Sequence, residues 1–275
     1  MGELSAEAPS TRPQPLPEIT QLGLITLLLA LAAVGWVVTD DRMAGMNTAP
    51  GVDLGMPGFY VITWVVMMAA MMFPSITPMV LMYARIQRGK RQRAQPVLVG
   101  ATAAFVAGYL IAWTAVGLVF YAMISLGRAV DLRLLGWDQA GPYIAGGVIA
   151  AAGLYQFTPA KQACLRKCRG PFEFLLSCWR PGRTGALWMG IKHGGWCVGC
   201  CWALMAALFA LGVMSIGWMA FIAALIAIEK LLPWRVIASR GVAVVLLVLG
   251  LSVALLPDDV PDVRSPAPDM QMAVT

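Results

Sequence analysis

The sequence predicts an all-α protein, a polytopic transmembrane helical bundle of about seven spans with a cytoplasmic N-terminus and an outer C-terminus. Hydrophobic residues make up 59% of the chain and charged residues only 12%, whereas a soluble domain carries about a quarter charged residues. Long apolar runs follow one another, and the basic residues between them are unevenly distributed. No separate soluble domain is therefore expected.

Each predicted span comes from an apolar run, because a helix that crosses the hydrocarbon core needs about 20 mostly apolar residues. The runs that meet or approach this length are 20–38, 59–83, 97–126, 140–159, 186–212, 216–232 and 234–256. Pro233 and the charged residues beside it, Glu229, Lys230 and Arg235, separate the last two runs. Together the runs predict a single transmembrane helical domain over residues 19–256.

The two ends of the chain differ from the rest in composition. Residues 1–18 are rich in Pro and Glu, and residues 257–275 in Pro and Asp, so we expect a disordered cytoplasmic tail and a disordered outer tail. The first tail has neither a basic cluster nor a small-residue cleavage site after the first apolar run. We therefore expect that run to remain as a helix and not to be removed as a signal peptide.

The basic residues indicate the orientation. Most of them lie in segments 85–93, 161–183 and 230–240, which join spans on one side. The other side has only Arg42, Arg128, Arg133 and Arg264. The positive-inside rule places the three basic segments, including a Cys-bearing amphipathic loop at 160–183, in the cytoplasm. We interpret the net charge of +6 as a topology signal and expect no nucleic-acid partner, because no aromatic residues interleave the basic clusters.

The fifth run begins with a cluster of soft metal ligands. IKHGGWCVGCCWALM, residues 191–205, holds the chain's one histidine, His193, and three of its six cysteines, Cys197, Cys200 and Cys201. At about 100° per residue the cysteines fall near +40°, −20° and +80° from His193, so the four share one helix face. Thiolate and imidazole favour Cu(I), Zn(II) or iron–sulfur clusters over Mg or Ca. The alternative is that the cysteines pack as small hydrophobic side chains.

The second run carries a methionine stripe. WVVMMAAMMFPSITPMVLMYA, residues 64–84, places all its methionines within less than half of the helix circumference. Its paired methionines are Met67, Met68, Met71 and Met72. Thioether sulfur binds Cu(I) weakly, so such a stripe can carry the ion, although methionine also serves as adaptable core filler. Pro74 and Pro78 predict a kink in this helix.

The cytoplasmic loop adds two secondary candidates. KQACLRKCRGPFEFLLSCW, residues 161–179, places Cys164 and Cys168 one helical turn apart. We expect this basic segment to lie along the inner membrane surface, with its basic neighbours favouring thiolates. The two thiols form an entry or exit site for a metal, or they are incidental cysteines on a solvated surface.

Two charged residues end the sixth run. Glu229 is a further secondary candidate, either near the cysteines or at the membrane interface. For Lys230 we expect the side chain to extend to the interface with its charge in water.

Three segments carry a resemblance. MMAAMMFPSITP, HGGWCVGCCWALM and GVMSIGWMAFIAALIAIEK resemble motifs of a bacterial family described only as predicted metal-binding integral membrane proteins. The resemblance covers roughly residues 60–235, and it implies metal binding in the bacterial inner membrane without an established activity. The positions that it implies are Met67, Met68, Met71, Met72, His193, Cys197, Cys200, Cys201, Glu229 and Lys230.

We therefore expect a multi-pass membrane protein that binds a soft transition metal, with Cu(I) preferred over Zn or haem. The expected role is metal transport or delivery to a metalloenzyme, not catalysis. Expected partners are the lipid bilayer, a metallochaperone or apo-metalloenzyme, and further copies of the chain or other subunits.

Three other readings remain open. The first is a membrane thiol–disulfide oxidoreductase that uses the Cys197-x-x-Cys200 pair, although thiols on the cytoplasmic side are normally kept reduced. The second is a haem or quinone protein with His193 as an axial ligand. The third is a scaffold in which the cysteines only pack.

Overall fold

The computed structural model describes residues 18–43, 56–92, 100–129, 137–212, 215–232 and 234–256. Within these ranges the regular structure is entirely helical, without a β-strand, so the all-α prediction is confirmed. The two predicted tails lie outside the described residues, apart from Glu18, where the first helix begins.

The described ranges contain nine helices. In chain order they are α1 (Glu18–Met43), α2 (Pro57–Gln92), α3 (Ala101–Ala129), α4 (Trp137–Tyr155), α5 (Pro159–Arg169), α6 (Pro171–Cys178), α7 (Gly182–Leu211), α8 (Ile216–Leu231) and α9 (Arg235–Leu255). Each of the seven predicted spans overlaps one of these helices, and α5 and α6 come from the segment predicted as a loop.

Five of the described helices are long and apolar enough to cross a membrane. They comprise Ile19–Arg42, Pro57–Arg88, Ala101–Leu126, Gly182–Leu211 and Val236–Leu255. The apolar part of α4, Gly141–Tyr155, is shorter, and α8 has only 16 residues. A transmembrane helical bundle is thus supported by five candidate spans.

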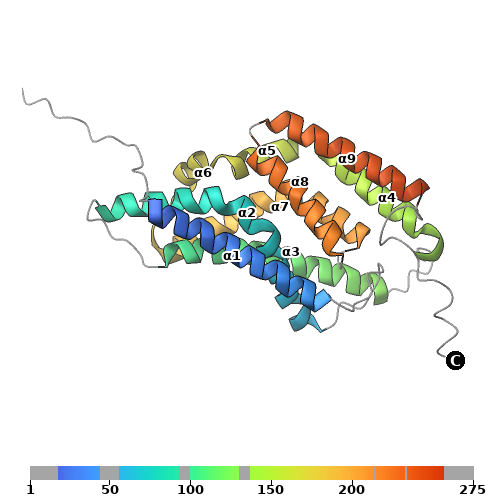
Figure 1. Ribbon diagram of the computed structural model, residues 1–275, viewed down its shortest axis with the longest axis horizontal. Helices are drawn as coiled ribbons and strands as arrows, with labels where there is room; N and C mark the ends of the chain where they lie inside the picture. The colour runs from blue at the N-terminus through green and yellow to red at the C-terminus, as the bar shows by residue number, and fades with distance from the viewer. Residues whose placement is uncertain are drawn as a thin grey trace, which may run out of the picture.

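Helix α7 lies at the centre of the bundle. It packs most extensively against α3 and also contacts α4, α5 and α8. Helices α4 and α9 form a second closely packed pair, and α1 lies along α2 (Figure 1). A residue on α7 therefore has helices on several sides, which explains how a site on this helix can be shielded from solvent.

Glycines bring α3 and α7 unusually close together. A Cβ atom at Gly190 would collide with the carbonyl oxygen of Phe105, and one at Gly108 would collide with the carbonyl oxygen of Leu187. A Cβ at Gly194 would lie 2.6 Å from the Cβ of Ala112. Small residues of this kind allow the backbones of membrane helices to approach. The contact fixes the position of the segment that carries the cysteines.

Helix α2 continues through Pro74 and Pro78 as one helix. Proline supplies no backbone N–H, which leaves a carbonyl group of the preceding turn without its helical donor. The hydroxyl of Thr77 also donates to the carbonyl of Phe73 at 2.8 Å, a hydrogen bond to the preceding turn that is known to bend helices. The kink at the prolines stays a prediction.

The segment between α4 and α7 is more deeply packed than predicted. Lys161 and Leu165 of α5 are buried, as are Phe174 and Leu175 of α6. Helix α5 packs against α7, and α6 contacts α2 and α5. One face of each helix therefore belongs to the core, and the position of the segment along the inner membrane surface stays a prediction.

Candidate metal centre

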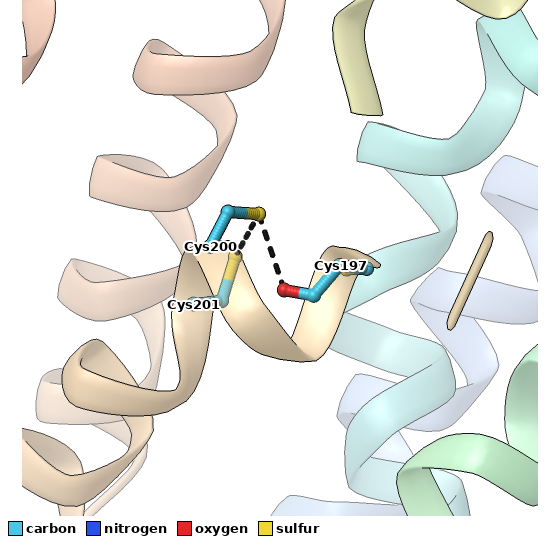
Figure 2. A group of neighbouring side chains, drawn as sticks. All are labelled: Cys197, Cys200 and Cys201. Carbon is cyan, nitrogen blue, oxygen red and sulfur yellow. Dashed lines mark hydrogen bonds between the residues drawn. The ribbon is translucent and has the colours of Figure 1, made fainter. Parts of the chain in front are cut away.

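Three cysteines of α7 form a compact cluster of thiols. The Sγ atoms of Cys197, Cys200 and Cys201 all lie within 4.8 Å of one another, and each residue is only 1% exposed. Figure 2 shows the contact of 3.3 Å between the sulfurs of Cys200 and Cys201, and the Cys200 thiol donating to the carbonyl of Cys197. The predicted shared face of these three residues is thus confirmed.

The spacing of the three sulfurs suits a single metal ion. Two sulfurs bound to one ion at about 2.3 Å each are at most about 4.6 Å apart, so only small shifts are needed for a shared ion. Cysteine sulfur is a soft donor that selects Cu(I), Zn(II) or iron–sulfur clusters. The cluster therefore has the donor chemistry and spacing of a soft-metal site.

His193 lies apart from the thiol cluster. Its ring is surrounded by Phe105, Tyr109 and Phe174, with ring centroids 6.0, 6.0 and 5.2 Å away. It is buried, its Nδ1 has no hydrogen-bond partner among the described residues, and it is not a member of the thiol group. The structure thus places the predicted histidine ligand in an aromatic environment one turn before Cys197.

Tyr109 links the two environments. Its ring lies against His193, and its hydroxyl is 3.1 Å from the sulfur of Cys197. The sequence reasoning did not identify Tyr109, because nothing in the local pattern of α3 distinguishes it from other apolar or aromatic positions. It was found only through the packing of α3 on α7.

The methionine stripe is buried along α2. Met67, Met68, Met71 and Met72 are each 3% exposed or less. Helices α2 and α7 make little direct backbone contact, so the stripe does not line the thiol cluster along its whole length. Lys230 of α8 connects the two, because its Nζ is 4.0 Å from the sulfur of Met72 and 2.9 Å from the sulfur of Cys197.

Lys230 points into the protein. Its Nζ lies 2.9 Å from the sulfur of Cys197 and 3.4 Å from the hydroxyl of Ser75. The expectation that this side chain extends to the membrane interface is therefore wrong, because a sulfur and a hydroxyl give the ammonium group partners inside the bundle. Lys230 follows Ile226 by one helical turn, and Ile226 is buried in the structure, so the two side chains share the inward face of α8.

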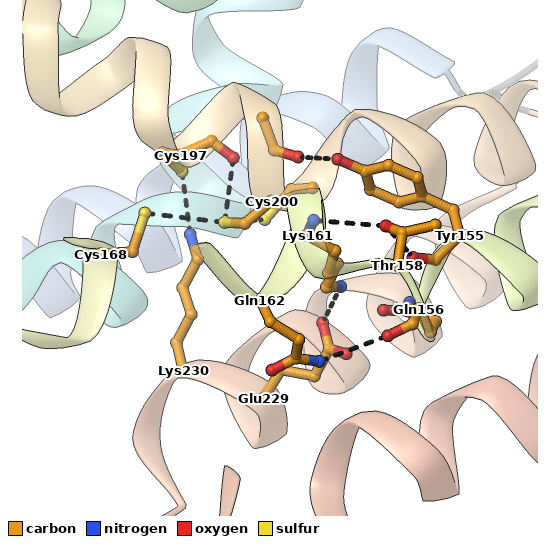
Figure 3. Close-up of polar contacts among 12 residues, drawn as sticks. Tyr155, Gln156, Thr158, Lys161, Gln162, Cys168, Cys197, Cys200, Glu229 and Lys230 are labelled. Carbon is orange, nitrogen blue, oxygen red and sulfur yellow. Dashed lines mark hydrogen bonds and ion pairs between the residues drawn. The ribbon is translucent and has the colours of Figure 1, made fainter. Parts of the chain in front are cut away.

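Helix α5 adds a fourth sulfur to the edge of the cluster. The Sγ of Cys168 lies 3.6 Å from the Sγ of Cys200 (Figure 3). Cys164, one turn earlier, lies against Gly199, where an added Cβ would be 2.7 Å from the Cys164 sulfur. Both secondary candidates therefore face α7. Burial raises the pKa of the Cys164 thiol, so the predicted preference for thiolate at this residue is wrong.

A buried ion pair joins α5 to α8. Lys161 Nζ lies 2.6 Å from Glu229 Oε2, and the two side chains are 0% and 1% exposed. The partner of Glu229 is thus a lysine of α5 (Figure 3), and its predicted location near the cysteines stays a prediction. Lys161 was missed, although it shares one face of α5 with Cys164, Leu165 and Cys168 at i, i+3, i+4 and i+7.

A family model described as copper chaperone, PpoB2, matches residues 61–253. The match covers more than half of the chain and includes the methionine stripe, the α7 thiols and both α5 cysteines. The chain belongs to this copper chaperone family. No curated protein and no solved structure matches it.

Proposed function

We propose that this member of the copper chaperone family binds Cu(I) in the membrane and delivers it to an apo-metalloenzyme or across the bilayer. The observation that carries the proposal is the group of three buried thiols within 4.8 Å of one another, in a chain matched by a copper chaperone family model. Thiols at this spacing are suited to a soft metal ion.

Charge balance is compatible with Cu(I) at this position. Cu(I) held by two thiolates carries one net negative charge, and an unpaired charge inside a membrane is costly. The ammonium group of Lys230, 2.9 Å from Cys197, offsets that charge. The residues around the thiols therefore suit a complex of one Cu(I) and two thiolates, with the third thiol available for exchange.

The methionine stripe has the properties of a transfer route. Its thioethers bind Cu(I) without holding it tightly, and Met72 comes within 4.0 Å of the Lys230 ammonium that also contacts Cys197. We place Met67, Met68, Met71 and Met72 on the path between the thiols and the far end of α2. His193 lies among aromatic rings and is not needed to complete the thiol site.

The membrane arrangement is part of the proposal. We propose that α1, α2, α3, α4, α7, α8 and α9 provide seven spans of a bacterial inner-membrane protein, with the N-terminus in the cytoplasm and the C-terminus outside. The basic residues in 85–93, 161–183 and 230–240 support this orientation. The thiol cluster then lies near the middle of α7 (Gly182–Leu211).

Copper content provides the test. The wild type and the triple variant Cys197→Ser/Cys200→Ser/Cys201→Ser are purified under reducing conditions with Cu(I) supplied, and metal is measured per chain. We expect about one copper per wild-type chain, since the three thiols are close enough to share one ion, and loss of that copper in the triple variant. Cys178→Ser, at the end of α6, is the control and should keep its copper. A wild type without copper, or a triple variant that retains it, would contradict the proposal.

A membrane thiol–disulfide oxidoreductase is the second candidate function. The short contacts between Cys200 and Cys201 and between Cys168 and Cys200, 3.3 and 3.6 Å, favour it over a purely packing role. Treatment with a mild oxidant followed by a thiol-reactive mass tag tests it. A shift in mobility that Cys200→Ser abolishes would support redox exchange, and a mobility that no oxidant changes would exclude it.

A further inference from the structure

Helix α5 presents two thiols to the buried cluster from outside α7. Cys168 Sγ is 3.6 Å from Cys200 Sγ, and Cys164 lies against Gly199, the residue directly before Cys200. Cys164 and Cys168 are one turn apart on the same helix, so their side chains are neighbours. The three α7 sulfurs therefore continue into two further sulfurs on a separate element.

The exposed fraction of these five cysteines is higher on α5 than on α7. Cys197, Cys200 and Cys201 are buried, whereas Cys164 and Cys168 are partly exposed. Among these five cysteines, an external ligand can therefore approach the partly exposed residues of α5 more readily than the buried thiols of α7. A soft ion can leave the buried cluster by passing to a sulfur that is already within about 4 Å.

The placement of α5 depends on specific polar contacts. The Lys161–Glu229 ion pair joins it to α8 at 2.6 Å, with both side chains buried. Just before α5, the hydroxyl of Tyr155 donates to the carbonyl of Gly199 at 2.7 Å, and Thr158 accepts from the backbone of Lys161 as the N-cap of α5. These contacts tie α5 to the part of α7 that carries the thiols, which keeps Cys168 beside Cys200.

From this arrangement we infer that Cys168 and then Cys164 form the exchange path by which Cu(I) enters and leaves the α7 thiol cluster. The inference rests on the proposed copper function and adds its route. In the outward step a bond forms between copper and Cys168 Sγ, and the bond between copper and Cys200 Sγ breaks. The proton of the Cys168 thiol passes to the Cys200 sulfur, and copper remains Cu(I), so no oxidant or reductant takes part.

Release kinetics test the path. The full-length protein is loaded with Cu(I) without oxygen and mixed with excess bathocuproine disulfonate, a membrane-impermeant Cu(I) chelator. We expect Cys168→Ser to keep the wild-type copper content and to release copper at least about tenfold more slowly, because an adjacent thiol has a high effective concentration. Cys164→Ser should slow release less, and the control Cys178→Ser should release copper at the wild-type rate.

The possible results separate the path from the copper function itself. If the wild type binds copper but Cys168→Ser releases it at the wild-type rate or faster, the path is wrong and the copper function stands. If Cys168→Ser loses its copper, Cys168 is a required ligand and not an exchange residue, which also overturns the path. If the wild type binds no copper, both the function and the path are wrong.

Discussion

The ammonium group of Lys230 lies 2.9 Å from the sulfur of Cys197, so that α8 supplies a cation to a thiol of α7. The same ammonium is 3.4 Å from the hydroxyl of Ser75 on α2. Lys230 is therefore the point at which three helices meet beside the candidate copper site. In a low-dielectric interior a cation at this distance stabilises a negatively charged copper–thiolate complex.

Replacing Lys230 by methionine should weaken Cu(I) binding. A hydrogen bond to a charged group is worth about 1.5–3 kcal/mol, which corresponds to a loss of affinity of about tenfold to a hundredfold. Competition with a Cu(I) chelator of known affinity measures the effect. Lys192→Met is the matched control, because Lys192 is an exposed lysine on α7 itself and its removal should leave the affinity unchanged. An equal affinity for wild type and Lys230→Met would show that Lys230 does not balance the charge of the complex.

The Lys161–Glu229 ion pair should be sensitive to the loss of one partner. Glu229→Gln leaves the Lys161 ammonium buried without its counter-ion, which costs about 3–5 kcal/mol. The double variant Lys161→Met/Glu229→Gln removes both charges and should lose much less stability. The apparent melting temperature in detergent is the measurement.

An exposed ion pair of the same length provides the control for Glu229→Gln. Lys167 and Glu173 are also 2.6 Å apart, but their side chains are 37% and 71% exposed. Exposed ion pairs contribute little to stability, so Glu173→Gln should leave the melting temperature nearly unchanged. If the two glutamine variants melt alike, burial of the Lys161–Glu229 pair has no effect on stability.

The helices and the shared thiol face could be predicted because they depend on local patterns. The apolar runs give the length of each helix, and the spacing of Cys197, Cys200 and Cys201 determines their common direction on α7. The same helical geometry places His193 on that face, but the side chain lies among aromatic rings contributed by α3 and α6. A helical angle alone does not reveal which neighbouring helix occupies the space beside a residue.

The charged residues were harder to predict from the sequence. A lysine near the end of an apolar helix can reach water at low cost, and this local rule led to the wrong expectation for Lys230. Pairing with groups on other helices overrides the rule both at Lys230 and at Lys161. Those partners lie far away in the sequence, 33 residues for Cys197 and 68 for Glu229, so only the folded arrangement identifies them.

Adding a methyl group at the α3–α7 contact should destabilise the protein. In Gly190→Ala the new Cβ would collide with the carbonyl oxygen of Phe105, and overpacking of this kind typically costs about 1–3 kcal/mol. Gly195→Ala on the same helix has open space around the new atom and should keep or slightly raise the melting temperature, since alanine favours helix. Equal melting temperatures for the two variants would show that α3 and α7 are not in close contact at Gly190.

Cys164 should react with maleimides only at a higher pH than an ordinary cysteine. Burial raises its pKa, so the reactive thiolate is scarce near neutral pH and becomes common only as the pH rises above the usual value for a cysteine. The rate of alkylation at Cys164 in the metal-free protein, followed by peptide mass spectrometry between pH 6 and pH 10, measures this shift. A pH profile that matches that of a free cysteine peptide would show that the thiol is fully solvated.

Replacing His193 by phenylalanine should leave the copper content unchanged. The His193 ring is enclosed by Phe105, Tyr109 and Phe174, so a phenylalanine ring of similar shape can pack in the same position. The three thiols form their group without a histidine nitrogen, and copper held by them should show only sulfur neighbours in X-ray absorption spectra. A loss of copper in His193→Phe, or a nitrogen neighbour in the wild-type spectrum that this variant lacks, would instead make His193 a ligand and would require its side chain to turn toward Cys197 when copper binds.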